Sequence, residues 1–229
     1  MKTAVIGTGK TGSEILPLLK ADEIVGPFST SHPLEDPTQL REAEVCVIFV
    51  PGPAALNLIP KLLETKIPCV WGSTGFEWPQ NLDDQLKKLN ITWVYARNFS
   101  FLINLLAPVL NILGQAKESM PEIQYKLSEV HHSQKKDAPS GTAKQWQEWL
   151  DLDENLQIQS QREGDVVGIH KLELSTPFEK LTLEHTSHER KLFAHGALTA
   201  AKLLLAHKNE LPKELISFDQ LLSLLGEKL

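Results

Sequence analysis

The first part of the chain alternates between short apolar runs and longer segments with helical spacing. Five runs rich in β-branched and aromatic residues predict strands, at 3–7, 23–28, 45–50, 69–72 and 91–96. Three segments between them have apolar residues three and four positions apart, as one face of a helix requires, at 13–21, 54–65 and 82–89. Strands that alternate with helices are typical of parallel βαβ units, so this part predicts a Rossmann-type, doubly wound α/β domain.

The hydrophobic pattern changes near residue 98. A long apolar helix is expected over 101–116, and a strand over 123–132 leads into a polar loop and then a helix that begins at Ser140. The segments 168–175 and 180–187 alternate apolar and polar residues at every second position. This alternation is typical of antiparallel strands with one face in water, so a second, α+β domain on a mixed or antiparallel sheet is expected.

We therefore divide the chain into a dinucleotide-binding domain, 1–98, and a substrate-binding and oligomerisation domain, 99–207. The leucine spacing near the C-terminus predicts a short amphipathic helix. The segment 208–229, which contains this helix, is expected to pack back on the first domain.

Composition and charge limit the classes of partner. The 229 residues carry a formal net charge of −6, which argues against a general nucleic-acid binder or a protein of anionic membrane surfaces. No apolar run approaches the ~20 residues of a membrane span, and the N-terminus does not resemble a secretory signal. Cys46 and Cys69 each lie in an apolar run and are expected to be small core residues. A cytoplasmic protein is expected.

A glycine loop follows the first predicted strand. Gly7, Gly9 and Gly12 form a GxGxxG pattern that encloses Lys10 and Thr11. In dinucleotide-binding folds such glycines allow a tight turn, a close approach of the backbone to a pyrophosphate, and close packing of the next helix. The strand before the loop and the predicted helix after it favour this function over a simple glycine turn.

The end of the second predicted strand bears on the choice of cofactor. Sites that prefer NAD usually have a carboxylate there for the ribose hydroxyls, and this chain has "PFSTSH" instead. Ser29, Thr30 and Ser31 could donate hydrogen bonds to a 2′-phosphate, with His32 and Lys10 as cationic helpers. NADPH is therefore favoured over NADH, and the alternative is that this segment is only a polar loop.

The stretch "EVHHSQKKDAPSGTA", residues 129–143, combines imidazoles, ammonium groups and the start of a helix. The amides of Gly141 and Thr142 would lie at the positive end of that helix, where a carboxylate can bind. Lysines and histidines just upstream add positive charge and a proton donor suited to neutral pH, namely His131, His132, Lys135 and Lys136. The alternative is a solvated loop in which Ser140 is only the N-cap.

This stretch resembles the signature of the 4-hydroxy-tetrahydrodipicolinate reductases, which are also called dihydrodipicolinate reductases. Further similar motifs occur along the chain, at "GSTGF" (72–76), "NFS" (98–100), "REGDVVGIH" (162–170) and "FAHGAL" (193–198). The resemblance implies a two-domain oxidoreductase of diaminopimelate and lysine biosynthesis, homotetrameric through the sheet of its second domain. It would transfer hydride from NADPH or NADH to a cyclic, dianionic imine.

The resemblance also implies roles for individual residues. His131 matches the proton donor and Lys135 the catalytic lysine. The residues that match contacts to the substrate carboxylates are His132, Lys135, Ser140, Gly141 and Thr142. Those that match the surroundings of the nicotinamide and its ribose are Gly72, Ser73, Thr74, Asn98 and Phe99.

The chain departs from the family's usual pattern near the cofactor. The glycine loop is one residue shorter than is common, Lys10 stands where an arginine is frequent, and Arg97 stands where a small residue is usual. Lysine keeps the positive charge but loses the bidentate geometry of arginine.

Other features of the sequence contribute less to the assignment. The spacing of the later histidines fits no zinc pattern, so no metal is expected. Arg190 is either a solvated arginine or a residue that braces the active-site loop. The first domain would also suit two other functions: a cofactor-sensing regulator without catalysis, and a related aspartate or semialdehyde-type dehydrogenase. The retained proton donor argues against the first, and a semialdehyde-type enzyme needs a nucleophilic cysteine in an active-site loop.

Overall fold

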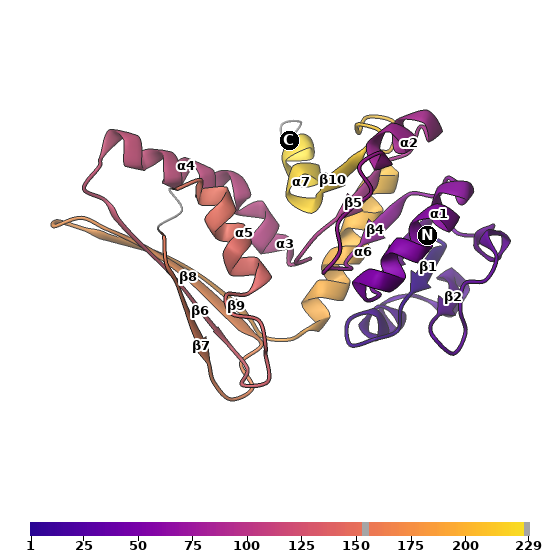
Figure 1. Ribbon diagram of the computed structural model, residues 1–229, viewed down its shortest axis with the longest axis horizontal. Helices are drawn as coiled ribbons and strands as arrows, with labels where there is room; N and C mark the ends of the chain where they lie inside the picture. The colour runs from indigo at the N-terminus through magenta and orange to yellow at the C-terminus, as the bar shows by residue number, and fades with distance from the viewer. Residues whose placement is uncertain (153–155, 227–229) are drawn as a thin grey trace. The chain divides into compact units, whose positions relative to one another are not determined.

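The computed structural model describes residues 1–152 and 156–226 (Figure 1). The chain divides into two compact units. Unit 1 comprises Met1–Ser100 together with Lys191–Leu229, and unit 2 comprises Phe101–Arg190. The two units have separate sheets and separate cores.

Unit 1 is built on a six-stranded sheet in the order β10-β5-β4-β3-β1-β2. Every adjacent pair is parallel. The strands are β1 Thr3–Ile6, β2 Ile24–Phe28, β3 Val45–Ile48, β4 Cys69–Trp71, β5 Trp93–Tyr95 and β10 Leu215–Ser217. The predicted doubly wound sheet is thus confirmed for the first five strands. The sixth, β10, was not expected, because three residues far along the chain carry no strand signal of their own.

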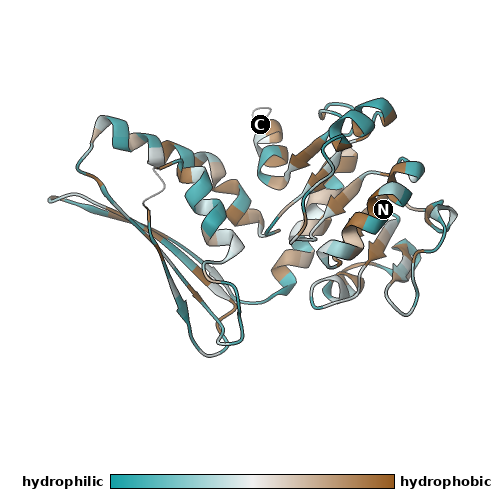
Figure 2. Ribbon diagram, viewed as in Figure 1, coloured by the Kyte–Doolittle hydropathy of each residue, from teal (hydrophilic) through white to brown (hydrophobic). Residues whose placement is uncertain are grey.

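Helices cover both faces of this sheet, which is why its central strands are apolar throughout. The longer helices of unit 1 are α1 Gly52–Thr65, α2 Leu82–Leu89, α6 Lys191–Ala206 and α7 Phe218–Gly226. One face packs Val5 and Val47 against apolar residues of α6 and α7. The other packs Ile48 and Trp71 against apolar residues of α1 and α2. Hydrophobic colouring accordingly gathers on the strands of the sheet (Figure 2).

The prediction of a regular helix over 13–21 was wrong. The segment forms short 3₁₀ turns instead, η1 Gly12–Glu14 and η2 Leu16–Leu18, followed by η3 Ala21–Glu23. Pro17 has no amide N–H to donate to a carbonyl four residues earlier, which removes one α-helical hydrogen bond from this short segment. A further 3₁₀ turn, η4 Pro37–Leu40, precedes β3.

The single helix expected over 101–116 is two helices. They are α3 Phe101–Leu105 and α4 Ala107–Ser119. Pro108 stands in the first turn of α4 and cannot donate to the carbonyl of Asn104, so the break falls just before it.

Unit 2 is built on a mixed sheet, as predicted, and the sheet has four strands in the order β7-β6-β8-β9. The strands are β6 Gln124–His131, β7 Ile158–Arg162, β8 Gly168–Ser175 and β9 Lys180–Ser187. β7, which was not expected, pairs parallel to β6, and the other pairs are antiparallel. α4 and α5 Gly141–Leu150 contribute to one core with this sheet, in which Leu127 and Leu172 pack with Trp146 and Leu150.

Helix α6 belongs to unit 1, whereas the sequence placed it in the second domain. Its alanine-rich face lies in the core of unit 1, and a Cβ at Gly196 would stand 1.6 Å from the carbonyl oxygen of Phe99. That approach is closer than any side chain permits. α7 lies in the same core, with Phe218 and Leu221 fully buried. No described helix is long and apolar enough to cross a membrane.

Cys46 and Cys69 are free thiols on neighbouring strands, directly opposite each other in register. Both are fully buried in an apolar core. Burial raises the pKa of the Cys69 thiol. These cysteines therefore pack as small apolar residues, as the sequence predicts.

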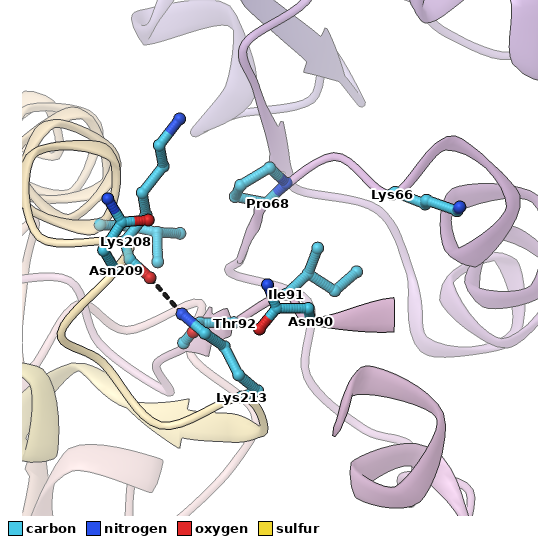
Figure 3. A pocket seen from close by; sticks show the side chains of 9 residues that line it. Lys66, Pro68, Asn90, Ile91, Thr92, Lys208, Asn209 and Lys213 are labelled. Carbon is cyan, nitrogen blue, oxygen red and sulfur yellow. Dashed lines mark hydrogen bonds between the residues drawn. The ribbon is translucent and has the colours of Figure 1, made fainter. Parts of the chain in front are cut away.

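Lysines gather where α1, α2 and α6 end, beside the amino ends of β4 and β5. A cavity of about 370 Å³ in this region is lined by Lys66, Lys208 and Lys213 among others (Figure 3). The Lys213 ammonium donates a hydrogen bond to the carbonyl of Lys208. The C-terminal end of a helix carries partial negative charge, so positively charged residues are favoured near such ends.

Candidate active site

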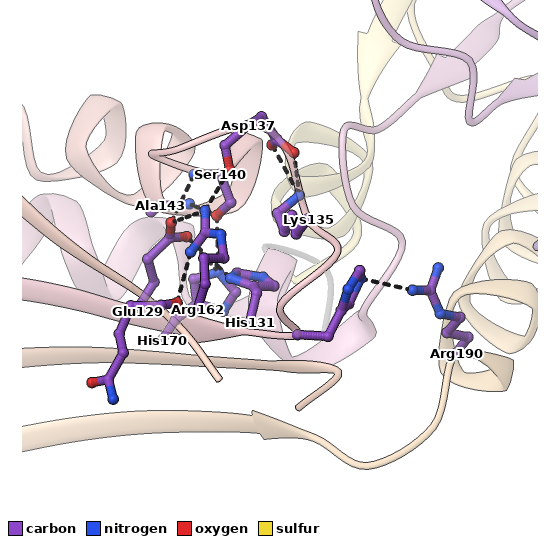
Figure 4. Close-up of polar contacts among 11 residues, drawn as sticks. Glu129, His131, Lys135, Asp137, Ser140, Ala143, Arg162, His170 and Arg190 are labelled. Atoms are coloured by element: carbon purple, nitrogen blue, oxygen red, sulfur yellow. Dashed lines mark hydrogen bonds and ion pairs between the residues drawn. The ribbon is translucent and has the colours of Figure 1, made fainter. Parts of the chain in front are cut away.

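Strand β6 directs alternate side chains to the helix-covered face of the unit 2 sheet. Leu127, Glu129 and His131 are buried on that face, whereas the residues between them are partly exposed. In the sheet register Glu129 lies opposite His170 of β8, and His131 lies opposite Arg162 of β7. The register therefore brings a carboxylate, two imidazoles and a guanidinium together beneath the start of α5 (Figure 4).

Glu129 is the centre of this cluster. Its Oε1 accepts hydrogen bonds from the Ser140 amide (3.0 Å) and from Nη2 of Arg162 (3.1 Å). Its Oε2 lies 3.4 Å from Nδ1 of His131 and 3.8 Å from Nε2 of His170. Burial raises the pKa of Glu129, but the hydrogen bonds from Ser140, Ser160 and Arg162 outweigh burial and hold this pKa below its usual value. Glu129 is therefore a buried anion.

His131 is only 7% exposed, and its ring lies edge-on to that of His170 with 5.1 Å between centroids. Burial lowers the pKa of His131 to about 4, although the Glu129 carboxylate acts in the opposite direction. Burial likewise lowers the pKa of His170 to about 3, helped by the nearby His131. Both rings are neutral near pH 7 when no ligand is bound.

The loop after β6 holds an ion pair. Nζ of Lys135 lies 2.8 Å and 2.9 Å from the two carboxylate oxygens of Asp137. Burial raises the pKa of Asp137. The hydrogen bond and positive charge of Lys135 lower it by more, so the pKa lies below its usual value. Arg162 also donates to the Asp137 carbonyl, which ties this loop to β7. Lys136 is exposed beside it.

Helix α5 begins where the sequence predicts. Ser140 is its N-cap: Oγ accepts the Ala143 amide at 3.1 Å and shares a hydrogen bond of 3.2 Å with Nε2 of His170. The first two helical residues are Gly141 and Thr142. Gly141 is exposed, and a Cβ there would meet no atom within 4 Å. The positive end of the helix is thus open at Gly141, beside the buried cluster.

His132 points away from that cluster and meets Arg190. Nη2 of Arg190 lies 3.0 Å from Nε2 of His132. Since a guanidinium only donates, Nε2 accepts, and the proton of the neutral ring is on Nδ1. Of the two interpretations of Arg190, this contact favours the one in which it braces the active-site loop.

In unit 1, the glycine loop borders a cavity of about 550 Å³. Its lining includes Gly7, Gly9, Ser29 and Thr30, and contains no carboxylate. Gly7 has a φ of +95°, and a Cβ on Gly12 would stand 1.8 Å from the carbonyl oxygen of Gly7, so both positions require glycine. A Cβ on Gly9 would meet nothing within 4 Å, which leaves the backbone open to a ligand. Lys10 and Thr11 follow on the outer turn of the loop.

Ser29 and its neighbours form a compact turn at the end of β2. The Ser29 amide donates to the His32 carbonyl at 2.9 Å, and the hydroxyls of Ser29 and Ser31 are 2.9 Å apart. These hydroxyls are exposed. The turn thus offers hydroxyl donors at the edge of the cavity where the sequence places a ribose or its phosphate.

The remaining predicted cofactor residues lie at the ends of β4 and β5. A Cβ on Gly72 would stand 2.1 Å from the Phe49 ring, and Ser73 Oγ accepts the Val50 amide at 3.0 Å. Thr74 is exposed. Oδ1 of Asn98 accepts the Ser100 amide, and the Phe99 ring packs between those of Phe49 and Phe218. Asn98 and Phe99 are both buried, so in this structure they shape the strand ends from inside unit 1.

The sequence alone predicts no role for Glu129, Asp137 or Arg162, and for His170 it predicts only a hydrogen-bonded or surface position. His170 is 2% exposed. The available signal was the charged residue two positions before His131, which alternation places on the same face of a strand.

Glu129, His131 and His170 could also hold a metal ion, since one ligand atom from each lies within 4.8 Å of the others. The Arg162 guanidinium, however, already supplies positive charge at this carboxylate. The expectation that the protein uses no metal stays a prediction.

Residues 103–222 match the family described as "Dihydrodipicolinate reductase, C-terminus". A 4-hydroxy-tetrahydrodipicolinate reductase of Bdellovibrio bacteriovorus is 32% identical over 221 residues, which cover 91% of this chain and 92% of the relative. The enzyme of the same name from Haloarcula marismortui is also 32% identical, over 89% of this chain and 93% of the relative.

Among solved structures, a dipicolinate-bound dihydrodipicolinate reductase from Paenisporosarcina sp. TG-14 is similar in fold. It superposes with a TM-score of 0.68 at 17% identity, over 96% of this chain and 99% of that one. An aspartate dehydrogenase from Thermotoga maritima has a TM-score of 0.52 at 11% identity. At these identities the likenesses show the fold alone.

Proposed function

Because this chain belongs to the 4-hydroxy-tetrahydrodipicolinate reductase family, it is an NAD(P)H-dependent oxidoreductase of diaminopimelate and lysine biosynthesis, and we propose the roles of its residues as follows. The substrate is a cyclic imine with two carboxylates. The assignment rests on one observation: His131, Lys135 and the first residues of α5 are grouped within unit 2. These first residues, Gly141 and Thr142 after the N-cap Ser140, are called the head of α5 below.

We propose that the head of α5 and nearby cations bind the substrate carboxylates. The Gly141 and Thr142 amides supply the positive end of a helix, and a helix end alone contributes only about 0.3–1 kcal/mol where it is exposed. Lys135 adds a full positive charge once its ammonium exchanges Asp137 for the substrate. Ser140 orients the helix head, and His132, held by Arg190, supplies a further donor through Nδ1.

His131 is proposed as the proton donor. When bound, the nicotinamide cofactor supplies a hydride to the conjugated imine, and the negative charge that develops on the ring is neutralised by one proton. His131 is neutral without ligand because burial lowers its pKa to about 4. A bound dianion favours the imidazolium and raises that pKa, so the donor is charged when the substrate is present.

The residues of unit 1 fit a dinucleotide. Open space at Gly9 and the tight turn at Gly7 provide the backbone cradle for a pyrophosphate. The same proposal gives phosphate contacts to Lys10, Thr11 and Gly12, and the nicotinamide end to Gly72, Ser73, Thr74, Asn98 and Phe99. A cavity lining without a carboxylate, with Ser29 at its edge, supports a preference for NADPH over NADH.

We further propose a cytoplasmic homotetramer that associates through the unit 2 sheet. Helices cover one face of that sheet, and its other face presents Val130 and Ile169 with the Lys171–Glu173 ion pair of 3.0 Å. An open sheet face of this kind can pack against a second copy. Two buried free thiols are consistent with a reducing compartment.

The competing functions are less well supported. A cofactor-sensing regulator has no need for a buried carboxylate behind an imidazole at an anion-binding helix. A semialdehyde-type dehydrogenase needs a nucleophilic cysteine, and both thiols here are fully buried in strands. The aspartate dehydrogenase shares only the fold at 11% identity.

The test is the loss of absorbance at the nicotinamide band, with substrate generated in place by the preceding synthase. The wild-type chain should oxidise NADPH only when that synthase turns over. His131→Ala should lower turnover by about 10²-fold or more while cofactor affinity stays within a factor of two or so. No oxidation by the wild-type chain would refute the function, and normal turnover of His131→Ala would remove His131 from the mechanism.

A further inference from the structure

We propose that Glu129 is the positioning residue of this active site: one of its carboxylate oxygens orients and helps to charge His131, and the other fixes the head of α5. The inference rests on the proposed function of His131. Glu129 acts through other residues and does not itself contact the substrate.

Glu129 is placed for this role by the sheet. It lies on β6, an inner strand of the sheet, between its register partners Ser160 on β7 and His170 on β8. Its side chain is 0% exposed. A carboxylate is costly to bury unless it is paired and hydrogen-bonded, so the groups around Glu129 determine whether it can stay charged there.

Oε1 of Glu129 binds the residue that caps α5. It accepts the Ser140 amide and the Arg162 guanidinium, and the same Nη2 atom of Arg162 donates to the Asp137 carbonyl. Arg162 also donates from Nη1 to the Gln161 carbonyl at 2.8 Å. Both ends of the short segment 137–140 are thus tied to one carboxylate oxygen and one guanidinium, directly before the amides at the head of α5.

Oε2 of Glu129 lies beside the imidazole of His131. It lies 3.4 Å from Nδ1 of His131, and among the described residues neither Oε2 nor Nδ1 has a hydrogen-bond partner. A carboxylate behind Nδ1 favours a proton on that nitrogen, so the second proton of the charged ring is on Nε2. Nε2 is then the atom that donates.

Space is kept at that donating atom. A Cβ at Gly168 would stand 3.1 Å from Nε2 and 3.4 Å from Cδ2 of His131. Glycine at this position of β8 therefore leaves the ring edge uncrowded. The carboxylate lies at the Nδ1 edge of the ring and the glycine at the Nε2 edge. The two together favour a ring orientation in which Nε2 is the donating atom.

The charges around His131 also indicate that Glu129 favours the protonated ring. Burial disfavours the imidazolium of His131, and so do the positive charges of Lys135 and Arg162. Glu129 is the strongest opposing influence, and Asp137 is a weaker one. The groups that face His131 from the surrounding elements are Glu129, Lys135, Asp137, Arg162 and His170. His185, opposite His170, acts on the latter.

The central experiment is Glu129→Gln, which keeps the side-chain shape and a carbonyl oxygen for the Ser140 amide but removes the charge. We expect kcat to fall about tenfold or more. Activity that needs protonated His131 is lost as the pH rises through its pKa in the substrate complex. Without the carboxylate this loss should move to lower pH by about one unit. Glu129→Asp, which keeps the charge, should restore the pH midpoint in part.

The matched control is Glu163→Gln, which removes the same charge from an exposed side chain next to Arg162. It should leave kcat and the pH profile unchanged. A second comparison uses His131→Ala as the background. If Glu129 acts through His131, Glu129→Gln lowers kcat there by no more than about twofold, whereas a purely structural role would cost the same in both backgrounds.

Wild-type protein gives an independent test that does not depend on how the variants fold. Nitrogen NMR of labelled histidine near pH 7 should show neutral His131 with its proton on Nδ1. A proton on Nε2 instead, or a folded Glu129→Gln with normal kcat and pH profile, would overturn the inference. An inactive wild-type enzyme with the Nδ1 tautomer would overturn the proposed function and leave the positioning of the ring intact.

Discussion

The Lys135 ammonium is bound to the Asp137 carboxylate, with Nζ 2.8 Å from Oδ1. The lysine that the sequence singles out for catalysis therefore has an anionic partner two residues away, in a loop that Arg162 also holds. Under the proposed role of Lys135, a substrate carboxylate would compete with Asp137 for this ammonium. Asp137 would then hold the lysine in place between turnovers.

This competition predicts opposite effects from the two residues. Asp137→Asn should tighten the binding of dipicolinate by up to about fivefold, since a partly exposed ion pair contributes about 0–1 kcal/mol. Lys135→Ala should weaken it by about tenfold or more, because a charge-assisted contact is lost. Isothermal titration of both variants measures this, and weaker binding by Asp137→Asn would show that the carboxylate supports the site.

Arg190 predicts an effect on affinity through His132. Arg190→Ala removes the 3.0 Å contact to Nε2 of His132 and frees that ring. KM for the imine should rise by about threefold to tenfold, with a smaller change in kcat, because the loss of a charged hydrogen bond costs about 1 kcal/mol or more. Lys191→Ala, at the exposed neighbouring residue, is the control. An unchanged KM would mean that Arg190 is a solvated surface residue.

Acid should destabilise unit 2. Folding lowers the pKa of His131 to about 4 and that of His170 to about 3, from a usual value of 6.5. The unfolded chain therefore binds these protons first, so stability is full above about pH 6.5 and falls as the pH drops toward 4. The lowered pKa values of Glu129 and Asp137 extend the loss to still lower pH.

The expected size is a fall in the thermal midpoint of about 10 °C between pH 7 and pH 5. His170→Asn removes one of the two titrating rings and should flatten the dependence. Calorimetry across that range checks it, and a midpoint independent of pH would show that these rings are solvated.

Cofactor preference should depend on Ser29. Ser29→Asp places a carboxylate at the end of β2, where it can bond ribose hydroxyls and repel a 2′-phosphate. The ratio of kcat/KM for NADPH over NADH should fall by about tenfold or more. Titration of both cofactors with wild type and variant measures it. A wild-type preference for NADH would refute the interpretation of the "STSH" turn.

The periodic parts of the fold were predictable from the sequence, and segments whose position depends on distant contacts were not. Helix α1 and strands β8 and β9 follow directly from their spacing. β10 has three residues and exists because it adds to the edge of β5. The 3₁₀ turns around Pro17 follow from the missing amide, a local signal that leucine spacing concealed.

Some residues of the candidate site could likewise be predicted from local patterns, and others depend on distant contacts. Ser140 as N-cap and His131 on a buried strand face could be read from the local pattern. Arg162 could not, because its contact with Glu129 spans 33 residues and depends on the parallel pairing of β6 with β7. A one-residue change of that register would turn Arg162 to the other face.

The most direct test of the whole account is a crystal structure of this chain with dipicolinate soaked in. The ring should bind in unit 2 with one carboxylate on the Gly141 and Thr142 amides, Lys135 released from Asp137 onto a carboxylate, and Nε2 of His131 facing the ring. A dipicolinate bound away from Thr142, with the Lys135–Asp137 pair intact, would contradict it.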